Sequence, residues 1–151
     1  RMKRIGITPS YHINHLYYYG DALKKDILGP ARAEKILPLG NTAEQGIRFS
    51  LHADQPMFES KPFRLIQTAI ERKTQSGDTI NAGQSISLLA AIKAMTIDAA
   101  WQIHMDQKIG SLEVGKYADF IILDRDPFKC PTTELENIKC TAVYVNGELV
   151  E

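Results

Sequence analysis

Two short apolar runs near the start of the chain have the length and composition of β-strands. The first lies at residues 5–9 in RIGITPS and the second at residues 47–53 in GIRFSLHAD. Between them, Pro30 is near the first position of a possible helix, and Asn41 and Glu44 have the spacing of a capping box. The pattern predicts two neighbouring parallel strands joined by a helical crossover.

Further along the chain the pattern changes to that of helices and then returns to that of strands. Apolar side chains recur at helical spacing through residues 61–74, and Ser87 and Thr96 are placed to cap two shorter helices. A β-rich run at residues 117–124 is followed at 139–151 by a hairpin pattern with an Asn-Gly pair, which suits a type I′ turn. The sequence predicts an α/β part, a helical middle and a small β-sheet at the end.

The charge and composition exclude several classes of protein. Lysine plus arginine equals aspartate plus glutamate at 18 each, so no overall field favours nucleic acid. No apolar run reaches the roughly 18 residues that a membrane-spanning helix needs. The two cysteines are too few for a disulfide scaffold and lack the spacing of a zinc knuckle. The 44% apolar content suits a domain with an ordinary core.

The second predicted strand runs directly into side chains that can bind metals or transfer protons. With a two-residue period, Ser50, His52 and Asp54 face one side of the strand, while Leu51 and Ala53 face the other. A carboxylate in this position is a candidate metal ligand and general base. An aspartate that ends a strand close to a proline is also typical of an ordinary turn. The residues by themselves leave both interpretations open.

Four stretches, in their order along the chain, resemble the amidohydrolase superfamily. The resemblance is to the branch called amidohydrolase family 3, which includes N-substituted formamide deformylase-like enzymes and exoenzyme regulatory proteins of the AepA type. PSYHINHLYYYGD and SLHADQP are similar to motifs of the seventh and eighth barrel strands of that branch. IGSLEVGKYADFIILDRDP resembles the passage from the barrel into its companion β-sandwich, and VYVNGELV resembles the final hairpin of that sandwich.

The resemblance implies an α/β fold that is the C-terminal part of a metal-dependent hydrolase TIM barrel with part of a β-sandwich. Residues 1–107 would supply the last two barrel strands and their helices, and residues 108–151 the C-terminal strands of the sandwich. Such enzymes have chains several times longer, so the chain resembles their C-terminal quarter. The His-x-His motif and the other metal-binding residues of the earlier strands have no counterpart here, and most of the metal site is expected outside this chain.

The resemblance also implies roles for particular residues. Asp54 matches the aspartate of the last barrel strand, which implies a metal ligand that accepts a proton from water. His15 matches a histidine in the seventh-strand loop and implies a contact with substrate. His52 is interpreted either as a residue that contacts substrate and orients Asp54 or as an interior histidine. His12 departs from the pattern, which more often has an aromatic residue there, and is interpreted as filler or surface.

Other polar residues of the first motif have less definite roles. Asp21 is interpreted either as an anchor for the loop or as a substrate contact. The three tyrosines, Tyr17, Tyr18 and Tyr19, are expected to line or cover a pocket rather than to react.

The implied activity is hydrolysis of a carbon-nitrogen bond, in an amide or cyclic amide, by the full-length protein with a divalent metal, zinc. This part alone is expected to be inactive and to bind metal weakly or not at all. The expected partner is a small-molecule substrate, with no nucleic acid and no membrane, and exposed strand edges predict self-association. The alternative is a regulatory or binding protein that keeps the fold without turnover; the metal-binding motifs of the complete gene would separate the two.

Overall fold

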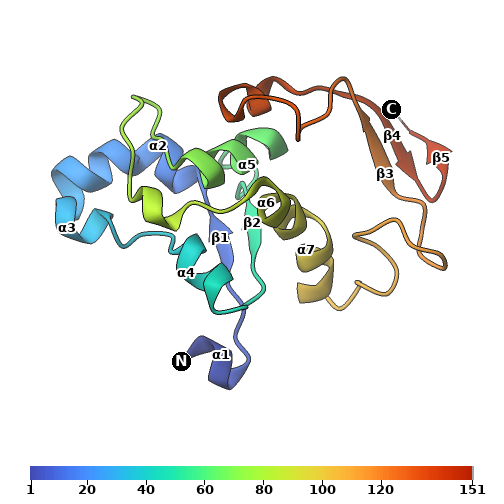
Figure 1. Cartoon of the computed structure of the whole chain (residues 1–151), viewed down its shortest axis with the longest axis horizontal. Coiled ribbons are helices and arrows are strands. Elements are labelled where there is room, and N and C mark those ends of the chain that lie inside the picture. The colour runs from blue at the N-terminus through green and yellow to red at the C-terminus, as the bar shows by residue number, and fades with distance from the viewer. Residues whose placement is uncertain (151) are drawn as a thin grey trace.

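The structure, a computed structural model, describes residues 1–150 as a mixed α/β fold. The helices are α1 (Met2–Ile5), α2 (Asn14–Ala22), the π-helix η1 (Leu23–Ile27), α3 (Pro30–Ala33), α4 (Leu39–Glu44), α5 (Pro62–Glu71), the 3₁₀ turn η2 (Ala82–Gln84), α6 (Leu88–Met95), α7 (Ile97–Gln102) and the 3₁₀ turn η3 (Thr132–Asn137). The strands are β1 (Ser10–His12), β2 (Ser50–His52), β3 (Phe120–Leu123), β4 (Cys140–Val145) and β5 (Glu148–Leu149). Figure 1 shows β1 and β2 side by side among the helices, with β3, β4 and β5 set apart at one end.

The predicted parallel pair is confirmed, but its first strand begins later than expected. β1 and β2 are parallel neighbours in which Ser10 is opposite Ser50 and His12 is opposite His52. The prediction of a strand at residues 5–9 is wrong. A helical turn occupies residues 2–5 and ends at Gly6, whose φ of 70° is the left-handed conformation that glycine adopts easily. A short apolar run cannot by itself distinguish such a turn from a strand.

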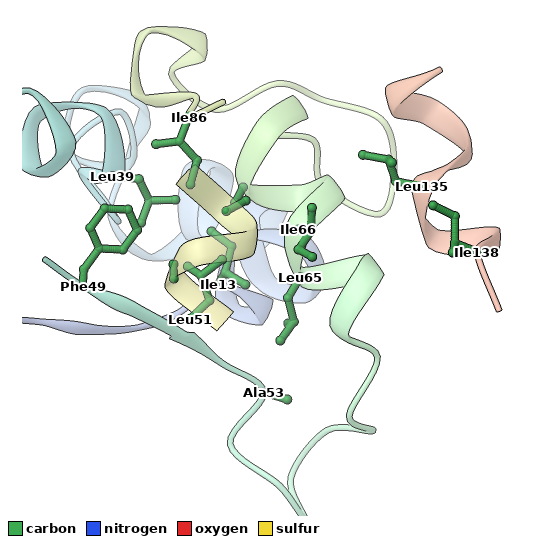
Figure 2. Packing of buried hydrophobic residues seen from close by; sticks show 13 residues of the cluster. Ile13, Leu39, Phe49, Leu51, Ala53, Leu65, Ile66, Ile86, Leu135 and Ile138 are labelled. Carbon is green, nitrogen blue, oxygen red and sulfur yellow. The ribbon is translucent and has the colours of Figure 1, made fainter. Parts of the chain in front are cut away.

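The main core lies between the strand pair and the helices that follow it (Figure 2). It is built from buried residues of β2, α4, α5, α6 and η3 and of the segments that adjoin the strands and helices: Ile13, Leu39, Phe49, Leu51, Ala53, Leu65, Ile66, Ala69, Ile86, Ala91, Ala94, Leu135 and Ile138. Leu51 and Ala53 lie in this core, as the two-residue period predicts. The opposite face of the strands is therefore available for polar side chains.

Helix α2 is held closely against the loop that follows α5. A Cβ at Gly20 would lie 2.6 Å from Thr74 Cγ2 and 2.8 Å from Ile80 Cδ1, so only glycine permits this approach. Asp21 Oδ1 accepts hydrogen bonds from the hydroxyls of Thr74, at 3.1 Å, and Ser76, at 2.9 Å. Of the two interpretations of Asp21, the structure supports the loop anchor.

A buried guanidinium joins the end of α5 to the segment before α4. Arg72 is fully buried, and it donates hydrogen bonds to the backbone oxygens of Ile36, Leu37 and Ile80. Burial lowers the pKa of Arg72 to about 10, and the nearby Glu34 carboxylate opposes this shift. The side chain therefore stays charged at neutral pH and fixes two chain segments that carry no regular structure.

The predicted helix starts are confirmed in part. Ser87 caps α6, because its hydroxyl accepts a hydrogen bond from the Ala90 N–H. Thr96 does precede α7, but its hydroxyl donates to Ile92 O of the preceding helix and caps nothing in α7. The capping box at Asn41 is wrong, since α4 has already begun at Leu39.

The predicted sheet at the end of the chain is confirmed. β3 pairs with β4 and β4 pairs with β5, all antiparallel. Asn146 and Gly147, with φ of 51° and 82°, form the two-residue hairpin loop, as a type I′ turn requires. Asp119 Oδ1 accepts from the Asn146 N–H and holds this turn beside the start of β3. Among residues 1–150 no helix is long and apolar enough to cross a membrane.

Candidate active site

Three histidines meet where β1 and β2 end. His12 and His52 are opposite each other in the parallel register, with ring centroids 5.0 Å apart and an angle of 20° between the rings. His15, in the first turn of α2, brings its ring centroid to 4.0 Å from that of His12. Ser10 and Ser50, one pleat earlier on the same face, share a hydrogen bond of 2.8 Å between their hydroxyls. The carboxyl ends of the two strands therefore carry a polar cluster on the face away from the core.

His12 is the centre of this cluster, and of its two interpretations, filler or surface, the second is wrong. The residue is buried, and its Nδ1 lies 3.4 Å from the carbonyl oxygen of His52. Its Nε2 is also buried and has no hydrogen-bond partner among the described residues. Because buried polar groups are almost always paired, this nitrogen marks a place where a ligand atom would be stabilised.

The surroundings of His15 and His52 favour neutral imidazoles. Burial lowers the pKa of His15, and the neighbouring His12 lowers it further, while the Asp54 carboxylate raises it and His52 lowers it. The pKa of His52 is lowered by burial and by His12, against the opposing effect of Asp54. Neutral rings keep a nitrogen lone pair, so these side chains can accept a hydrogen bond or bind a cation.

Asp54 lies just beyond the end of β2, at the edge of the cluster. Its φ of 59° is left-handed, which aspartate tolerates better than most residues, and its carbonyl oxygen accepts a hydrogen bond of 2.8 Å from the Met57 N–H. The side chain is exposed, and its carboxylate has no ion-pair or hydrogen-bond partner within residues 1–150. The turn thus presents a carboxylate beside His15 and His52, where it opposes the lowering of their pKa values by burial.

An aromatic wall borders the cluster. Phe58 stacks on Tyr18 with centroids 4.8 Å apart, and lies 5.3 Å from the His12 ring and 5.7 Å from the Tyr19 ring. Two of the three tyrosines therefore line the site as expected. Tyr17 does not, since its ring packs against the Arg64 guanidinium and it lines a different, polar pocket.

The donor types of the cluster suit a divalent metal, but their arrangement does not complete a site. Imidazole nitrogen and carboxylate oxygen are common ligands of zinc. Among the described residues, however, no group of three histidine, cysteine, aspartate or glutamate side chains is placed to hold an ion. The cluster can therefore contribute one or two ligands and needs others.

Comparison with known proteins decides the family. The model of the amidohydrolase family matches residues 1–151. The chain belongs to the amidohydrolase family. The resemblance inferred from the four sequence stretches is confirmed.

Relatives of this amidohydrolase chain include enzymes with much longer chains. It is 32% identical over 115 residues to N-substituted formamide deformylase of Arthrobacter pascens, which covers 76% of this chain and 21% of that protein. It is 31% identical over 150 residues to the protein LONG AFTER FAR-RED 3 of Arabidopsis thaliana, covering 98% of this chain and 25% of that one. The chain thus spans about a quarter of the length of these curated relatives.

A solved structure has the same fold. An uncharacterized metal-dependent hydrolase from Pyrococcus furiosus superposes with a TM-score of 0.68 at 23% identity, over 85% of this amidohydrolase chain and 25% of that chain. At this level of identity the similarity concerns the fold alone.

Proposed function

We propose that this chain is the C-terminal part of a metal-dependent amidohydrolase that cleaves a carbon-nitrogen bond in an amide or cyclic amide. The observation that carries the proposal is the free Asp54 carboxylate, which lies beside a cluster of three histidines at the carboxyl ends of two parallel strands. Enzymes built on parallel α/β barrels have their sites at this end of the strands. The relative of known activity, a formamide deformylase, acts on a bond of this kind.

In this proposal the described fold is part of a larger one. Residues 1–107 are the last two strands and helices of a TIM barrel, and residues 108–151 are strands of a companion β-sandwich. Two features support this assignment: the short relative length of the chain, and the parallel strand pair with helices on its core side. The missing metal ligands would come from the other barrel strands, which agrees with the incomplete donor set.

The chain's own residues would divide the chemistry between them. A bound divalent metal, zinc in our proposal, would polarise the amide carbonyl and lower the pKa of the attacking water to about 7. Asp54 would be a ligand of that metal and would accept the proton of the water. The same proton would then pass to the leaving nitrogen as the carbon-nitrogen bond breaks, so that water is added across the bond.

The histidines would position the substrate. His15 reaches the open side of the cluster and, as a neutral ring, can donate one N–H to a substrate oxygen or nitrogen while the other nitrogen stays unprotonated. His52, held opposite His12 at the end of β2, would contact substrate and limit the orientations of the Asp54 turn. The buried Nε2 of His12 is a further candidate for a hydrogen bond to substrate, which the sequence motif does not suggest.

Removal of metal tests the proposal. The complete gene product should hydrolyse members of a panel of N-acyl and cyclic amides, lose turnover on dialysis against a chelator, and regain it when zinc is returned. Residues 1–151 expressed alone should contain less than one equivalent of zinc and show no turnover, since they hold too few ligands. Turnover that survives complete removal of metal, or a full equivalent of tightly bound zinc in residues 1–151 alone, would contradict the proposal.

A further inference from the structure

An apolar pocket opens beside the histidine cluster, and the proposed chemistry leaves it without a role. It encloses about 330 Å³ and is lined by His15, Tyr19, Ala22, Leu23 and Ile27. Four of these five side chains carry no charge and no strong acceptor, and three are exposed: His15, Tyr19 by 44% and Ile27 by 65%. We call this hollow the α2–η1 pocket.

The pocket is built by a change of helix type. His15, Tyr19, Leu23 and Ile27 follow one another at every fourth position, and in a straight α-helix of 3.6 residues per turn such a row would drift steadily around the axis. At Leu23 the helix becomes a π-helix, in which the Leu28 N–H donates to Leu23 O at 2.8 Å. The wider turn reverses the drift and returns Ile27 to the row. Such π-turns are rare and are frequently found at functional sites.

His15 connects the pocket with the histidine cluster. Its ring lines the pocket, and its centroid lies 4.0 Å from that of His12. The Tyr19 ring centroid lies 5.7 Å from that of His15 and 5.7 Å from that of Phe58, so Tyr19 belongs both to the pocket and to the aromatic wall. A molecule whose polar group contacts His15 on the cluster side can therefore extend an apolar group along α2.

The pocket is already formed in this structure because α2 is firmly placed. The close approach of Gly20 to Thr74 and the hydrogen bonds of Asp21 fix the helix against the loop after α5. Figure 1 shows α2 and the turn toward α3 on the side of the fold away from β3, β4 and β5. A pre-formed apolar hollow with one polar group at its edge has the character of a small-molecule subsite.

The size and the rim of the pocket indicate the occupant. A closed apolar cavity of about 150 Å³ holds benzene, so this hollow can take a ring with a short linker. The neighbouring positions Lys24, Lys25 and Asp26 are charged, and Lys24 Nζ lies 3.9 Å from Asp78 Oδ2, whereas lysine and aspartate are depleted in protein interfaces relative to the rest of the surface. An apolar group of a small molecule fits both observations.

We propose that the α2–η1 pocket binds an apolar substituent, of aryl or branched-alkyl size, on the amide substrate of this protein. The inference rests on the proposed function for the identity of the substrate. It adds that the enzyme selects amides by the group that reaches along α2 past His15. Amides with only a methyl group at that position would leave the pocket filled with water and bind more weakly.

Binding of two matched amides to the chain tests the pocket without relying on turnover. N-benzylacetamide and N-methylacetamide have the same polar group and differ in the apolar substituent. In methyl NMR spectra of the chain, N-benzylacetamide should shift the signals of Leu23 and Ile27 and bind about tenfold or more tightly than N-methylacetamide. Equal binding of the two amides, or shifts confined to other residues, would overturn the proposal.

Two variants and a control show whether the binding site is this pocket. Ala22→Phe fills the hollow, and Ile27→Asp places a charge in it at a position exposed enough to leave the core intact. Each should abolish the preference for N-benzylacetamide. Ala31→Phe, on the exposed side of α3, should keep it. Unchanged preference in a folded Ile27→Asp protein would overturn the proposal even if Ala22→Phe fails to fold.

Failure of the pocket and failure of the proposed function give different results. If the pocket binds N-benzylacetamide as expected but the complete protein hydrolyses no amide, the hydrolase proposal fails and the binding site remains. If the complete protein hydrolyses methyl and benzyl amides with equal kcat/KM and Ala22→Phe changes neither, the pocket proposal fails and the hydrolase remains.

Discussion

Replacing Arg72 by methionine should destabilise the fold more than any surface substitution. The guanidinium donates to the carbonyl oxygens of Ile36 and Leu37 at 3.0 Å and of Ile80 at 3.2 Å, and it is fully buried. Hydrogen bonds to a charged group contribute about 1.5 to 3 kcal/mol each, and methionine would leave the carbonyls of Ile36 and Ile80 unpaired, while Leu37 O would keep its bond from the Leu39 N–H. Desolvation of the guanidinium, visible in its lowered pKa, offsets part of this gain. We therefore expect a net loss of about 3 to 5 kcal/mol in the free energy of unfolding.

Urea denaturation followed by far-UV circular dichroism measures this loss. At slopes of about 1 to 3 kcal/mol per molar urea, the midpoint of Arg72→Met should fall by roughly 1 M or more. Arg72→Lys keeps the charge but lacks the planar guanidinium that reaches the carbonyls of both chain segments. Its loss in the free energy of unfolding should therefore be intermediate. Lys73→Met is the matched control, since Lys73 is exposed and its ion pair with Glu71 spans 3.9 Å. If the free energies of unfolding of Arg72→Met and Lys73→Met agree within about 0.5 kcal/mol at the same slope, the buried guanidinium does not stabilise the fold as proposed.

Three further predictions concern stability and assembly. Burial raises the pKa of the Asp98 carboxyl and Arg48 and Lys93 oppose this shift, so Asp98 contributes stability below its unfolded pKa of 3.8 and loses that contribution as the pH rises through the folded pKa. Asp98→Asn should therefore gain stability relative to wild type as the pH rises from 3 to 6. A constant difference in urea midpoints over that range would contradict this prediction. Ser87→Ala should reduce the free energy of unfolding by about 1 kcal/mol through loss of the α6 cap, and Ser85→Ala, whose side chain caps no helix, should change it by less than half as much in the same assay. The exposed apolar residues of the chain should drive self-association, and light scattering that shows a monomer at high concentration would exclude it.

The parallel strand pair and the terminal sheet could be predicted because local patterns determine them. Two apolar runs with a helical pattern between them predict a parallel crossover. An Asn-Gly pair between two β-favouring runs predicts the hairpin of β4 and β5. The boundary of β1 could not be predicted in the same way. Residues 5–9 are as apolar as a strand, but the turn at Gly6 interrupts them.

The buried position of His12 was not predicted, although the sequence contains a signal for it. Both strands end in the pattern serine, apolar residue, histidine: Ser10 to His12 and Ser50 to His52. Aligning these two stretches as parallel neighbours gives the observed register and places both histidines at the same edge. The early placement of the first strand hid this relation.

The buried Arg72 and the π-helix had no comparable signal. Arginine is rarely buried, and at the end of α5 it has a φ of 59°, where glycine is the usual residue. Its partners are backbone carbonyls of Ile36, Leu37 and Ile80, which no side-chain pattern reveals. The π-turn at Leu23 likewise depends on one hydrogen bond to Leu28 rather than on composition. Such features depend on tertiary contacts and emerge only from the structure.

The proposed catalytic role of Asp54 is tested most directly by the rate of amide hydrolysis. This rate is measured for the complete protein and for its Asp54→Asn variant, each loaded with zinc to the same stoichiometry. Asparagine keeps the shape of the side chain but removes its charge and its capacity to accept a proton. The kcat of Asp54→Asn should be lower than that of the wild type by about two to four orders of magnitude. Asp106→Asn, in the loop after α7, should leave the rate unchanged. Undiminished turnover in zinc-loaded Asp54→Asn would show that another group takes the proton and that the assignment of Asp54 is wrong.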